Sequence, residues 1–304
     1  MTLTHWALPL AAWIFSPLML GIINRVKAIF AGRRGQPLLQ LYFDLFKLLR
    51  KGSVYSRSTS LVIRIAPSVT LACVAIGTTL LPWGGLRAPA AFAGDIILLA
   101  YLLGLARFVT VLAALDTGSA FEGMGASREV QFGALAEPSF FLGMLVLVLH
   151  SGALGLSNIM AGLSAVAWQT SSVLLILVGC SWFVLLLTEN SRIPVDDPNT
   201  HLELTMIHEV MVLDYSGPDF AYILYGASLK LWIFAALLVN LIVPVQSLPA
   251  WSQAPLFLLG MGVVAVLVGV VESILARLRL HQVPKILIGS AALSIVALIV
   301  ELMG

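Results

Sequence analysis

The feature that most constrains this chain is a series of continuously apolar stretches, each long enough to cross a lipid bilayer. A helix needs about 20 apolar residues to span the hydrocarbon core. The stretches do not alternate polar and apolar residues with a period of two, which argues against a membrane β-barrel. The sequence therefore predicts an all-α fold, a polytopic membrane bundle of eight transmembrane helices in a single integral membrane domain, residues 1–304. The predicted spans are residues 6–24, 61–82, 94–115, 132–154, 171–188, 221–243, 255–276 and 284–302.

Lys and Arg residues are distributed very unevenly between the predicted loops. Nine of the 17 lie in or beside one loop: eight lie between the first and second spans, and Arg64 lies in the first turn of the second span. Short loops rich in Lys and Arg stay on the cytoplasmic side of a membrane. We therefore expect a multi-pass protein of the cytoplasmic (inner) membrane, with this loop inside and both termini outside. The predicted cytoplasmic loops are the first, third, fifth and seventh connections between spans, residues 25–60, 116–131, 189–220 and 277–285.

The first loop contains a short amphipathic stretch, LLQLYFDLFKLL, at residues 38–49. Gln40, Asp44 and Lys47 share one stripe of a helix at spacings of four and three, and apolar side chains cover the rest. Twelve residues are too few to cross the bilayer. The pattern predicts a helix that lies at the membrane interface.

The chain offers little with which to hold a metal or a redox cofactor. Cys73 and Cys180 lie in different predicted spans, and their spacing suits neither an iron–sulfur cluster nor a zinc site. Nucleotide-binding motifs and nucleophile elbows are absent. His201 and Glu203 could share a helix face as metal ligands with His208, several residues further on. A zinc enzyme would also need a third ligand close to the first two, which is not evident here. We therefore interpret both histidines as members of a polar network. We expect this chain to bind no cofactor, so any redox centre belongs to a partner.

Several ionisable residues lie inside predicted spans, in the half of the bilayer that we expect to face the cytoplasm. They are Arg107, Glu137, Lys230 and Glu272, and Glu189 lies directly after the fifth span. A charged side chain near the bilayer centre costs about 2.5–3.5 kcal/mol, so such groups should face one another or a hydrated cavity. Static ion pairs that hold the helices together are one interpretation. We favour the other, a polar track that connects the loops to the membrane centre.

Three of the predicted cytoplasmic loops carry short polar motifs. The motif residues are Arg33, Arg34, Gly35, Gln40, Asp44 and Lys47 in the first loop, Gly125–Glu129 and Glu137–Pro138 in the third, and Glu189, Arg192, Pro194, Asp196, Pro198, Glu203 and Asp214–Ser216 in the fifth. Together they resemble the complex I subunit 1 family, which comprises the quinone-site membrane subunit of NADH–quinone oxidoreductase and its counterparts in group 4 membrane-bound [NiFe]-hydrogenases such as formate hydrogenlyase. Residues 115–119, Leu-Asp-Thr-Gly-Ser, look more like the hydrogenase branch.

This chain departs from the family pattern at a few positions. Gln36 stands where the family usually has Pro, directly after the Arg-Arg-Gly turn. Asn199 and His201 replace two glutamates expected before Glu203, and about three extra residues separate Glu203 from Asp214. The lost glutamates argue against the acidic funnel of the quinone branch.

The resemblance implies a non-catalytic membrane subunit that docks a hydrophilic redox module and couples electron transfer to proton or sodium movement. The residues expected to carry ion translocation or coupling are Arg107, Glu137, Glu189, Asp196, Glu203, Lys230 and Glu272. The residues expected to dock the hydrophilic module are Arg33, Arg34, Gln40, Asp44, Lys47, Arg128, Glu129, Arg192 and Asp214. The implied partners are hydrogenase-like large and small subunits and iron–sulfur subunits, which would carry the [NiFe] centre and the clusters, together with antiporter-like membrane subunits. Nothing in the sequence indicates binding to nucleic acid.

Three alternatives remain open at this stage. The chain could form the quinone chamber of an NADH–quinone oxidoreductase, in which the first, third and fifth cytoplasmic loops would frame the site. It could act as a stand-alone secondary transporter, although such proteins commonly show two related halves, and we detect no internal repeat. A purely structural anchor would explain the loops but not Lys230.

Overall fold

The computed structural model describes residues 3–56, 58–83, 85–163, 165–196, 206–244 and 248–303. Every element named within these ranges is a helix. Those long and apolar enough to cross a membrane number eight, and they are α1 (Leu3–Phe30), α3 (Leu61–Thr79), α4 (Asp95–Asp116), α5 (Ala120–Ser151), α8 (Ser172–Glu189), α9 (Gly217–Ile242), α10 (Ala250–Ile274) and α11 (Val283–Met303). The predicted all-α bundle with eight spans is therefore confirmed.

Shorter elements lie in the connections between these helices. They are α2 (Gln40–Leu49), α6 (Leu156–Gly162), α7 (Ala165–Thr170) and two 3-10 turns, η1 (Glu209–Val212) and η3 (Leu280–Gln282). We call one end of the bundle the basic end: there lie the described parts of four connections between consecutive long helices, residues 31–56, 58–60, 117–119, 190–196, 206–216 and 275–282. It corresponds to the four predicted cytoplasmic loops.

The connection between α4 and α5, the predicted third loop, is much shorter than the sequence suggests. We expected a glycine-rich loop over residues 116–131, but α5 begins at Ala120, and only residues 117–119 separate it from α4. Gly118 makes the turn with a φ of 71°. Gly125 lies inside α5 because the fifth loop packs there: an added Cβ would lie 2.9 Å from the Ile207 carbonyl oxygen. These glycines permit close packing and do not break the helix.

The amphipathic stretch of the first loop is a helix, α2, in agreement with its sequence pattern. It contacts α1 and α9, and the Tyr42 hydroxyl donates a hydrogen bond to the Ile14 carbonyl of α1. Gly21 of α1 lets the loop approach closely, since a Cβ there would lie 2.0 Å from the Leu38 carbonyl oxygen. The interfacial position of α2 stays a prediction.

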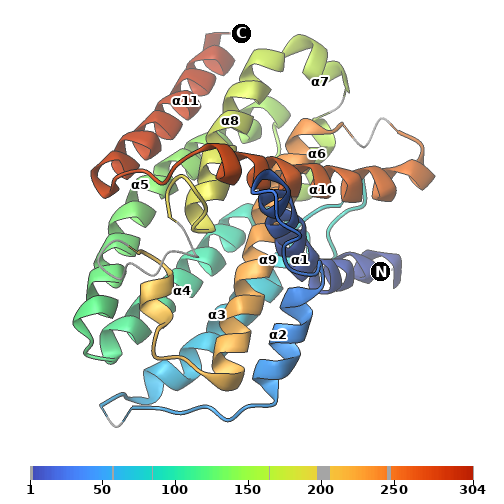
Figure 1. Ribbon diagram of the computed structural model, residues 1–304. Helices are drawn as coiled ribbons and strands as arrows, with labels where there is room; N and C mark the ends of the chain where they lie inside the picture. The colour runs from blue at the N-terminus through green and yellow to red at the C-terminus, as the bar shows by residue number, and fades with distance from the viewer. Residues whose placement is uncertain are drawn as a thin grey trace.

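Helix α9 is the most completely buried of the spans. It contacts α1, α2, α3, α8 and α10, and the other strongly packed helix pairs are α3 with α4, α5 with α11, α8 with α11 and α1 with α10 (Figure 1). Residues 228–241 of α9 are almost entirely buried. Whatever charge α9 carries is therefore placed inside the bundle.

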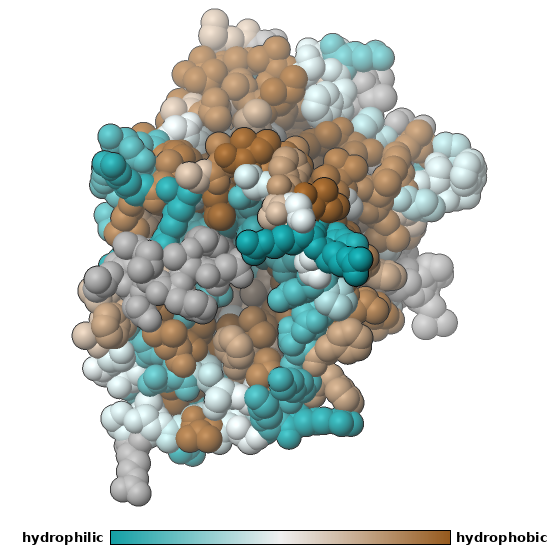
Figure 2. Space-filling model, viewed as in Figure 1, coloured by the Kyte–Doolittle hydropathy of each residue, from teal (hydrophilic) through white to brown (hydrophobic). Residues whose placement is uncertain are grey.

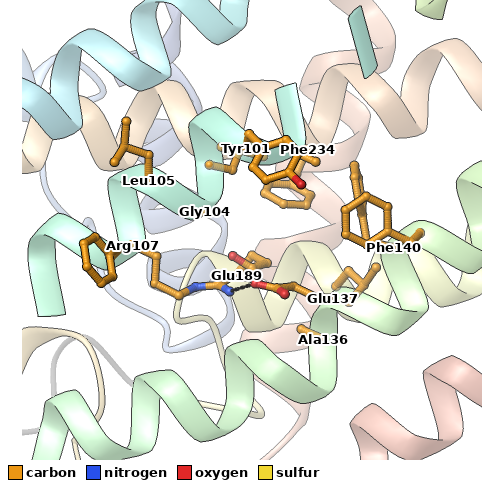
Figure 3. A pocket seen from close by; sticks show the side chains of 14 residues that line it. Tyr101, Gly104, Leu105, Arg107, Ala136, Glu137, Phe140, Glu189 and Phe234 are labelled. Carbon is orange, nitrogen blue, oxygen red and sulfur yellow. Dashed lines mark hydrogen bonds and ion pairs between the residues drawn. The ribbon is translucent and has the colours of Figure 1, made fainter. Parts of the chain in front are cut away.

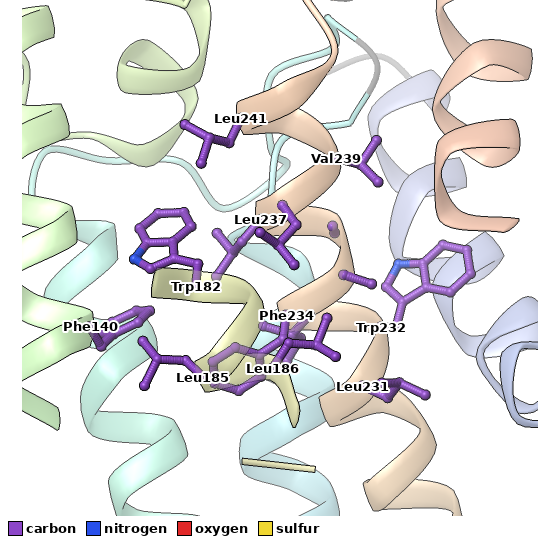
Figure 4. Close-up of a cluster of buried hydrophobic side chains, with 14 of the residues drawn as sticks. Phe140, Trp182, Leu185, Leu186, Leu231, Trp232, Phe234, Leu237, Val239 and Leu241 are labelled. Atoms are coloured by element: carbon purple, nitrogen blue, oxygen red, sulfur yellow. The ribbon is translucent and has the colours of Figure 1, made fainter. Parts of the chain in front are cut away.

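Aromatic and leucine side chains fill the space between α5, α8 and α9 (Figure 4). The Phe140 ring lies 6.0 Å from that of Trp182 and 6.4 Å from that of Phe234, centroid to centroid. Gly143 makes room for Trp182, because an added Cβ would lie 2.4 Å from the indole nitrogen. Lipid tails are as apolar as these side chains, so close packing rather than water exclusion stabilises such helix contacts.

The outer surface of the spans is largely apolar. Brown, hydrophobic side chains cover the upper part of the view in Figure 2, over α10 and α11, whereas teal residues gather in its middle and lower parts. Leu259, Ile295 and Leu302 are among the exposed side chains on these two helices. A broad apolar exterior fits a multi-pass membrane protein.

Candidate ion-coupling site

Arg107 of α4 is the centre of a charged cluster inside the bundle. Its guanidinium Nη1 lies 2.9 Å from Glu137 Oε1 and its Nε lies 3.4 Å from Glu129 Oε1, both on α5. Its Nη2 donates a hydrogen bond to Glu189 at the end of α8 (Figure 3). One arginine therefore joins three helices through three carboxylates.

Lys230 of α9 completes this cluster. Its Nζ lies 2.8 Å from Glu189 Oε2, so Glu189 is held between two cations. Lys230 lies near the middle of α9, where an unpaired ammonium would be costly. We call Arg107, Glu129, Glu137, Glu189 and Lys230 the Arg107 cluster.

The position of Arg107 depends on a glycine in α5. Glu129, Gly133 and Glu137 follow one another at intervals of four, so they share one face of the helix. A Cβ at Gly133 would lie 2.4 Å from Arg107 Nη1 and 2.8 Å from Cζ. The missing side chain leaves the space in which the guanidinium lies between the two glutamates.

A second charged cluster lies around Glu272 of α10, whose side chain is fully buried. Lys27 Nζ of α1 is 2.8 Å from Glu272 Oε2, and Arg192 Nη1 of the fifth loop is 3.4 Å from Oε1. We call these three residues the Glu272 cluster. It ties the fifth loop to two helices, α1 and α10, that pack against each other.

Asp196 fastens the fifth loop to the last connection of the bundle. Arg277 Nη2 lies 2.8 Å from its Oδ1. Its Oδ2 accepts hydrogen bonds from the backbone N–H groups of Ile207, at 3.1 Å, and His208, at 3.3 Å. A carboxylate that accepts backbone donors in this way fixes the path of the loop.

His208 lies in the fifth loop, between the charged groups of both regions. Burial lowers its pKa from the usual 6.5, and nearby Lys230 acts in the same direction. Glu129, Asp196 and Glu189 oppose this shift because they stabilise the protonated ring. The histidine is therefore electrostatically connected to the Arg107 cluster and to Asp196.

Two sizeable cavities adjoin these charges. One, of about 460 Å³, lies between α4 and α5 and reaches α8 and α9, with Arg107, Glu137 and Glu189 on its wall (Figure 3). The other, of about 410 Å³, lies between α1, the first loop with α2, the fifth loop and α9, and includes Gln40 and His208.

The structure brings most of the predicted coupling residues together. Arg107, Glu137, Glu189 and Lys230 form one cluster, and Glu272 lies in the other. Asp196 pairs with Arg277, which the sequence did not single out. Glu203 lies outside the described residues. The coupling role of each residue stays a prediction.

The predicted docking residues occupy different environments. Arg33, Arg34 and Lys47 are exposed, and Gln40 donates a 2.9 Å hydrogen bond to Asp44. The others make internal contacts: Glu129 pairs with Arg107, Arg192 with Glu272, Arg128 Nη1 donates to the Met206 carbonyl, and the Asp214 amide donates to Glu122. Their docking role also stays a prediction.

Sequence reasoning missed two partners of the network, Lys27 and Gly133. Lys27 was counted with the first loop because the apolar run stops near residue 24, whereas α1 continues to Phe30. The i, i+4, i+8 spacing of Glu129, Gly133 and Glu137 was visible in the sequence and could have marked Gly133. Among the described residues, no group of three or more His, Cys, Asp or Glu is arranged to hold a metal.

Comparison with known proteins identifies the class to which this bundle and its charged clusters belong. Residues 4–302 match the NADH dehydrogenase family, and the chain is a member of that family. It is 33% identical to formate hydrogenlyase subunit 4 of Escherichia coli K12 over 284 residues, which cover 91% of each chain. It is 34% identical to hydrogenase-4 component C of the same organism over 291 residues, which cover 92% of this chain and 90% of the relative.

More distant likeness extends to two other proteins. The chain is 27% identical to a subunit of the NADH-quinone oxidoreductase of Rickettsia canadensis over 202 residues, 66% of this chain and 58% of the relative. A chain of the membrane-bound sulfane sulfur reductase, an archaeal respiratory membrane complex, has a TM-score of 0.83 over 98% of both chains. Its identity is 18%, so this likeness shows the fold alone.

Proposed function

We propose that this chain is the membrane-anchoring and ion-translocation-coupling subunit of a complex I-like, formate hydrogenlyase-like hydrogenase complex. The observation that carries the proposal is the Arg107 cluster, a set of paired charges from four helices inside an apolar bundle. Membership of the NADH dehydrogenase family and the two similar hydrogenase subunits support it.

The charges are arranged so that a movement of the fifth loop reaches the membrane interior. Arg192 and Asp196 anchor that loop to Glu272 and Arg277, and Glu189 lies where α8 joins it. A hydrophilic module that docks on the loop would therefore change the surroundings of carboxylates that also contact Arg107 and Lys230. In this way a redox step could bias the movement of protons or sodium ions.

The partners follow from the same reasoning. Hydrogenase-like large and small subunits and iron–sulfur subunits would bind at the basic end, on the cytoplasmic side of the inner membrane, and would carry the [NiFe] centre and the clusters. Antiporter-like membrane subunits would pack against the spans. Both termini would then lie outside, and this chain would bind no cofactor itself.

Purification of the complex through this subunit in mild detergent tests the proposal. A large soluble partner with two Cys-x-x-Cys pairs, together with iron–sulfur and antiporter-like chains, is expected. Recovery of the chain alone, with ion transport in liposomes, would overturn the proposal in favour of a secondary transporter.

A quinone-site function is the second candidate, and one observation favours it. The 410 Å³ cavity is framed by the first and fifth loops, and polar Gln40, Asp44 and His208 line it together with apolar side chains. A quinone analogue that blocks turnover of the purified complex, along with flavin- or NADH-binding partners, would support this candidate over the hydrogenase.

A further inference from the structure

Glu137 is an exposed carboxylate inside a membrane span. Its side chain is 55% exposed, and it lies about 21 Å along α5 from Ser151, at 1.5 Å per residue. With Ser151 at one boundary of a hydrocarbon core ~30 Å thick, the carboxylate lies about 9 Å inside the other boundary. A carboxylate at that depth is costly unless another group covers it.

The cavity beside Glu137 opens between α4 and α5 and is bordered by aromatic side chains. Tyr101 and Phe108 of α4 are 73% and 59% exposed, and Phe141 of α5 is 48% exposed. Phe140 and Phe234 form its inner wall (Figure 3). The result is a largely apolar groove with Arg107, Glu137 and Glu189 on its wall, and Glu137 is the more exposed of the two carboxylates.

The charges of the Arg107 cluster, beside the groove, do not balance. The Arg107 cluster contains three carboxylates, Glu129, Glu137 and Glu189, and two cations. In the described part of the chain, Glu137 makes its ion pair through one oxygen, Oε1, with Arg107. Its other oxygen can accept a hydrogen bond from outside the chain.

We propose that the α4–α5 groove docks a transmembrane helix of a neighbouring membrane subunit, and that this helix presents a hydrogen-bond-donating side chain to Glu137. Inter-helical hydrogen bonds and close packing drive helix association in membranes. The proposal rests on the function proposed above, because it names the face on which a membrane partner of the complex binds.

Two other occupants fit the groove less well. A lipid with a cationic headgroup would have to bring that group about 9 Å into the hydrocarbon core to reach Glu137, whereas a side chain on a helix can be placed at any depth. A second copy of this chain, related by twofold symmetry about the groove, would bring Glu137 near its own equivalent. Two carboxylates at that place would repel each other.

Photo-crosslinking in the intact complex tests the proposal. p-Benzoylphenylalanine replaces Phe108 or Phe141 in the groove, and Leu259 or Ile295 on α10 and α11 as exposed controls. Only the groove positions are expected to give an adduct with a second membrane subunit. The crosslinked peptide should be an apolar span that contains a donor such as Lys, Arg, His, Ser, Thr or Asn.

Lipid adducts alone, or a dimer of this chain, would overturn the groove proposal while leaving the proposed function intact if the soluble partners still co-purify. Equal crosslinking at the control positions would also overturn it. Loss of the soluble partners from the unmodified complex would instead contradict the proposed function.

A matched pair of glycine substitutions provides an independent measurement. Gly104 lines the groove and Gly262 lies on α10, and no atom of the described residues lies within 4 Å of a Cβ added at either position. G104W is expected to lose the membrane partner from the purified complex, whereas G262W retains it. Full recovery of the partner with G104W would contradict the proposal.

Discussion

The ion pair between Lys230 and Glu189 allows the most direct test of the charge network. K230M replaces the ammonium by an apolar side chain of similar length and leaves Glu189 with Arg107 alone. Breaking a buried ion pair by removing one partner costs about 3–5 kcal/mol. Lys230 is 18% exposed and Glu189 keeps one cation, so we expect the lower value, about 3 kcal/mol.

Thermal unfolding of the purified complex in mild detergent measures this effect. A loss of about 1 kcal/mol lowers the melting temperature of a domain of 150–250 residues by roughly 2–4 °C, and by less in a larger one. This chain has 304 residues, so we use about 2 °C per kcal/mol and expect K230M to lower the melting temperature by about 6 °C. E189Q should also be destabilising. The double variant should lose less than the sum of the two, by about 0.5–3 kcal/mol, because the residues contact each other.

K285M is the matched control, since Lys285 is an exposed lysine at the start of α11. It should melt at the same temperature as the unmodified protein. The reasoning would be refuted if K230M and K285M behaved alike, or if the effects of K230M and E189Q were additive. Ion movement measured on the same samples should be abolished by K230M while the soluble redox activity remains.

Three further substitutions test other contacts. G133A should displace the Arg107 guanidinium, because the new Cβ would lie 2.4 Å from Nη1; we expect impaired ion movement and a loss of about 1–3 kcal/mol of stability, whereas G289A, with open space around it, should have neither effect. Burial lowers the pKa of His208 below 6.5, so the folded chain favours the neutral ring. The contribution of His208 to the free energy of unfolding is therefore fully present above pH 6.5, and as the pH falls below that value it is lost by up to about 1.4 kcal/mol per pH unit. H208Q should remove that part of the pH dependence of melting, and an unchanged pH profile would contradict this assignment. G125V should loosen the fifth loop, because even a Cβ at that position would lie 2.9 Å from the Ile207 carbonyl oxygen; limited proteolysis of that loop should accelerate, and an unchanged rate would argue against the packing role.

The number, order and approximate bounds of the spans could be predicted because they depend on local properties. A stretch of about 20 apolar residues is enough to identify a membrane helix, and the regular polar spacing in α2 is enough to identify an amphipathic one. The start of α5 was misplaced because glycines usually indicate a loop. Gly123 and Gly125 lie inside the helix instead, and Gly125 is needed there because the fifth loop packs closely against it.

The deep charges could also be predicted, but not their pairing. Lys27 and Glu272 are far apart in the sequence and meet only because α1 packs against α10. Arg107 reaches Glu189 because Gly133 of α5 has no side chain, which leaves room for the guanidinium between α4, α5 and α8. Such contacts depend on the three-dimensional packing of helices, for which the hydrophobic pattern of each helix carries no information.

Of the five carboxylates in the two clusters and at Asp196, the three most buried are each held by at least two groups of the described residues. Glu272 and Glu189, which are almost fully buried, each pair with two cations. Asp196 is held by at least one arginine and two backbone N–H groups. Within the described part of the chain, Glu129 and the half-exposed Glu137 each pair with Arg107, which they share. This order is expected where water is scarce, because each buried charge must be compensated by fixed partners.

The number of partners also distinguishes the carboxylates whose contacts are fixed within this chain from Glu137, which can accept a further partner. Glu189 is held from two sides, by Arg107 of α4 and Lys230 of α9, so a new partner would have to displace one of these cations to bind it. Glu137 is held from one side and opens onto the α4–α5 groove, so a partner can bind to it without breaking the pairs of Glu189. The contact with the neighbouring subunit is therefore expected at Glu137, from which Arg107 connects it to Glu189 and Lys230.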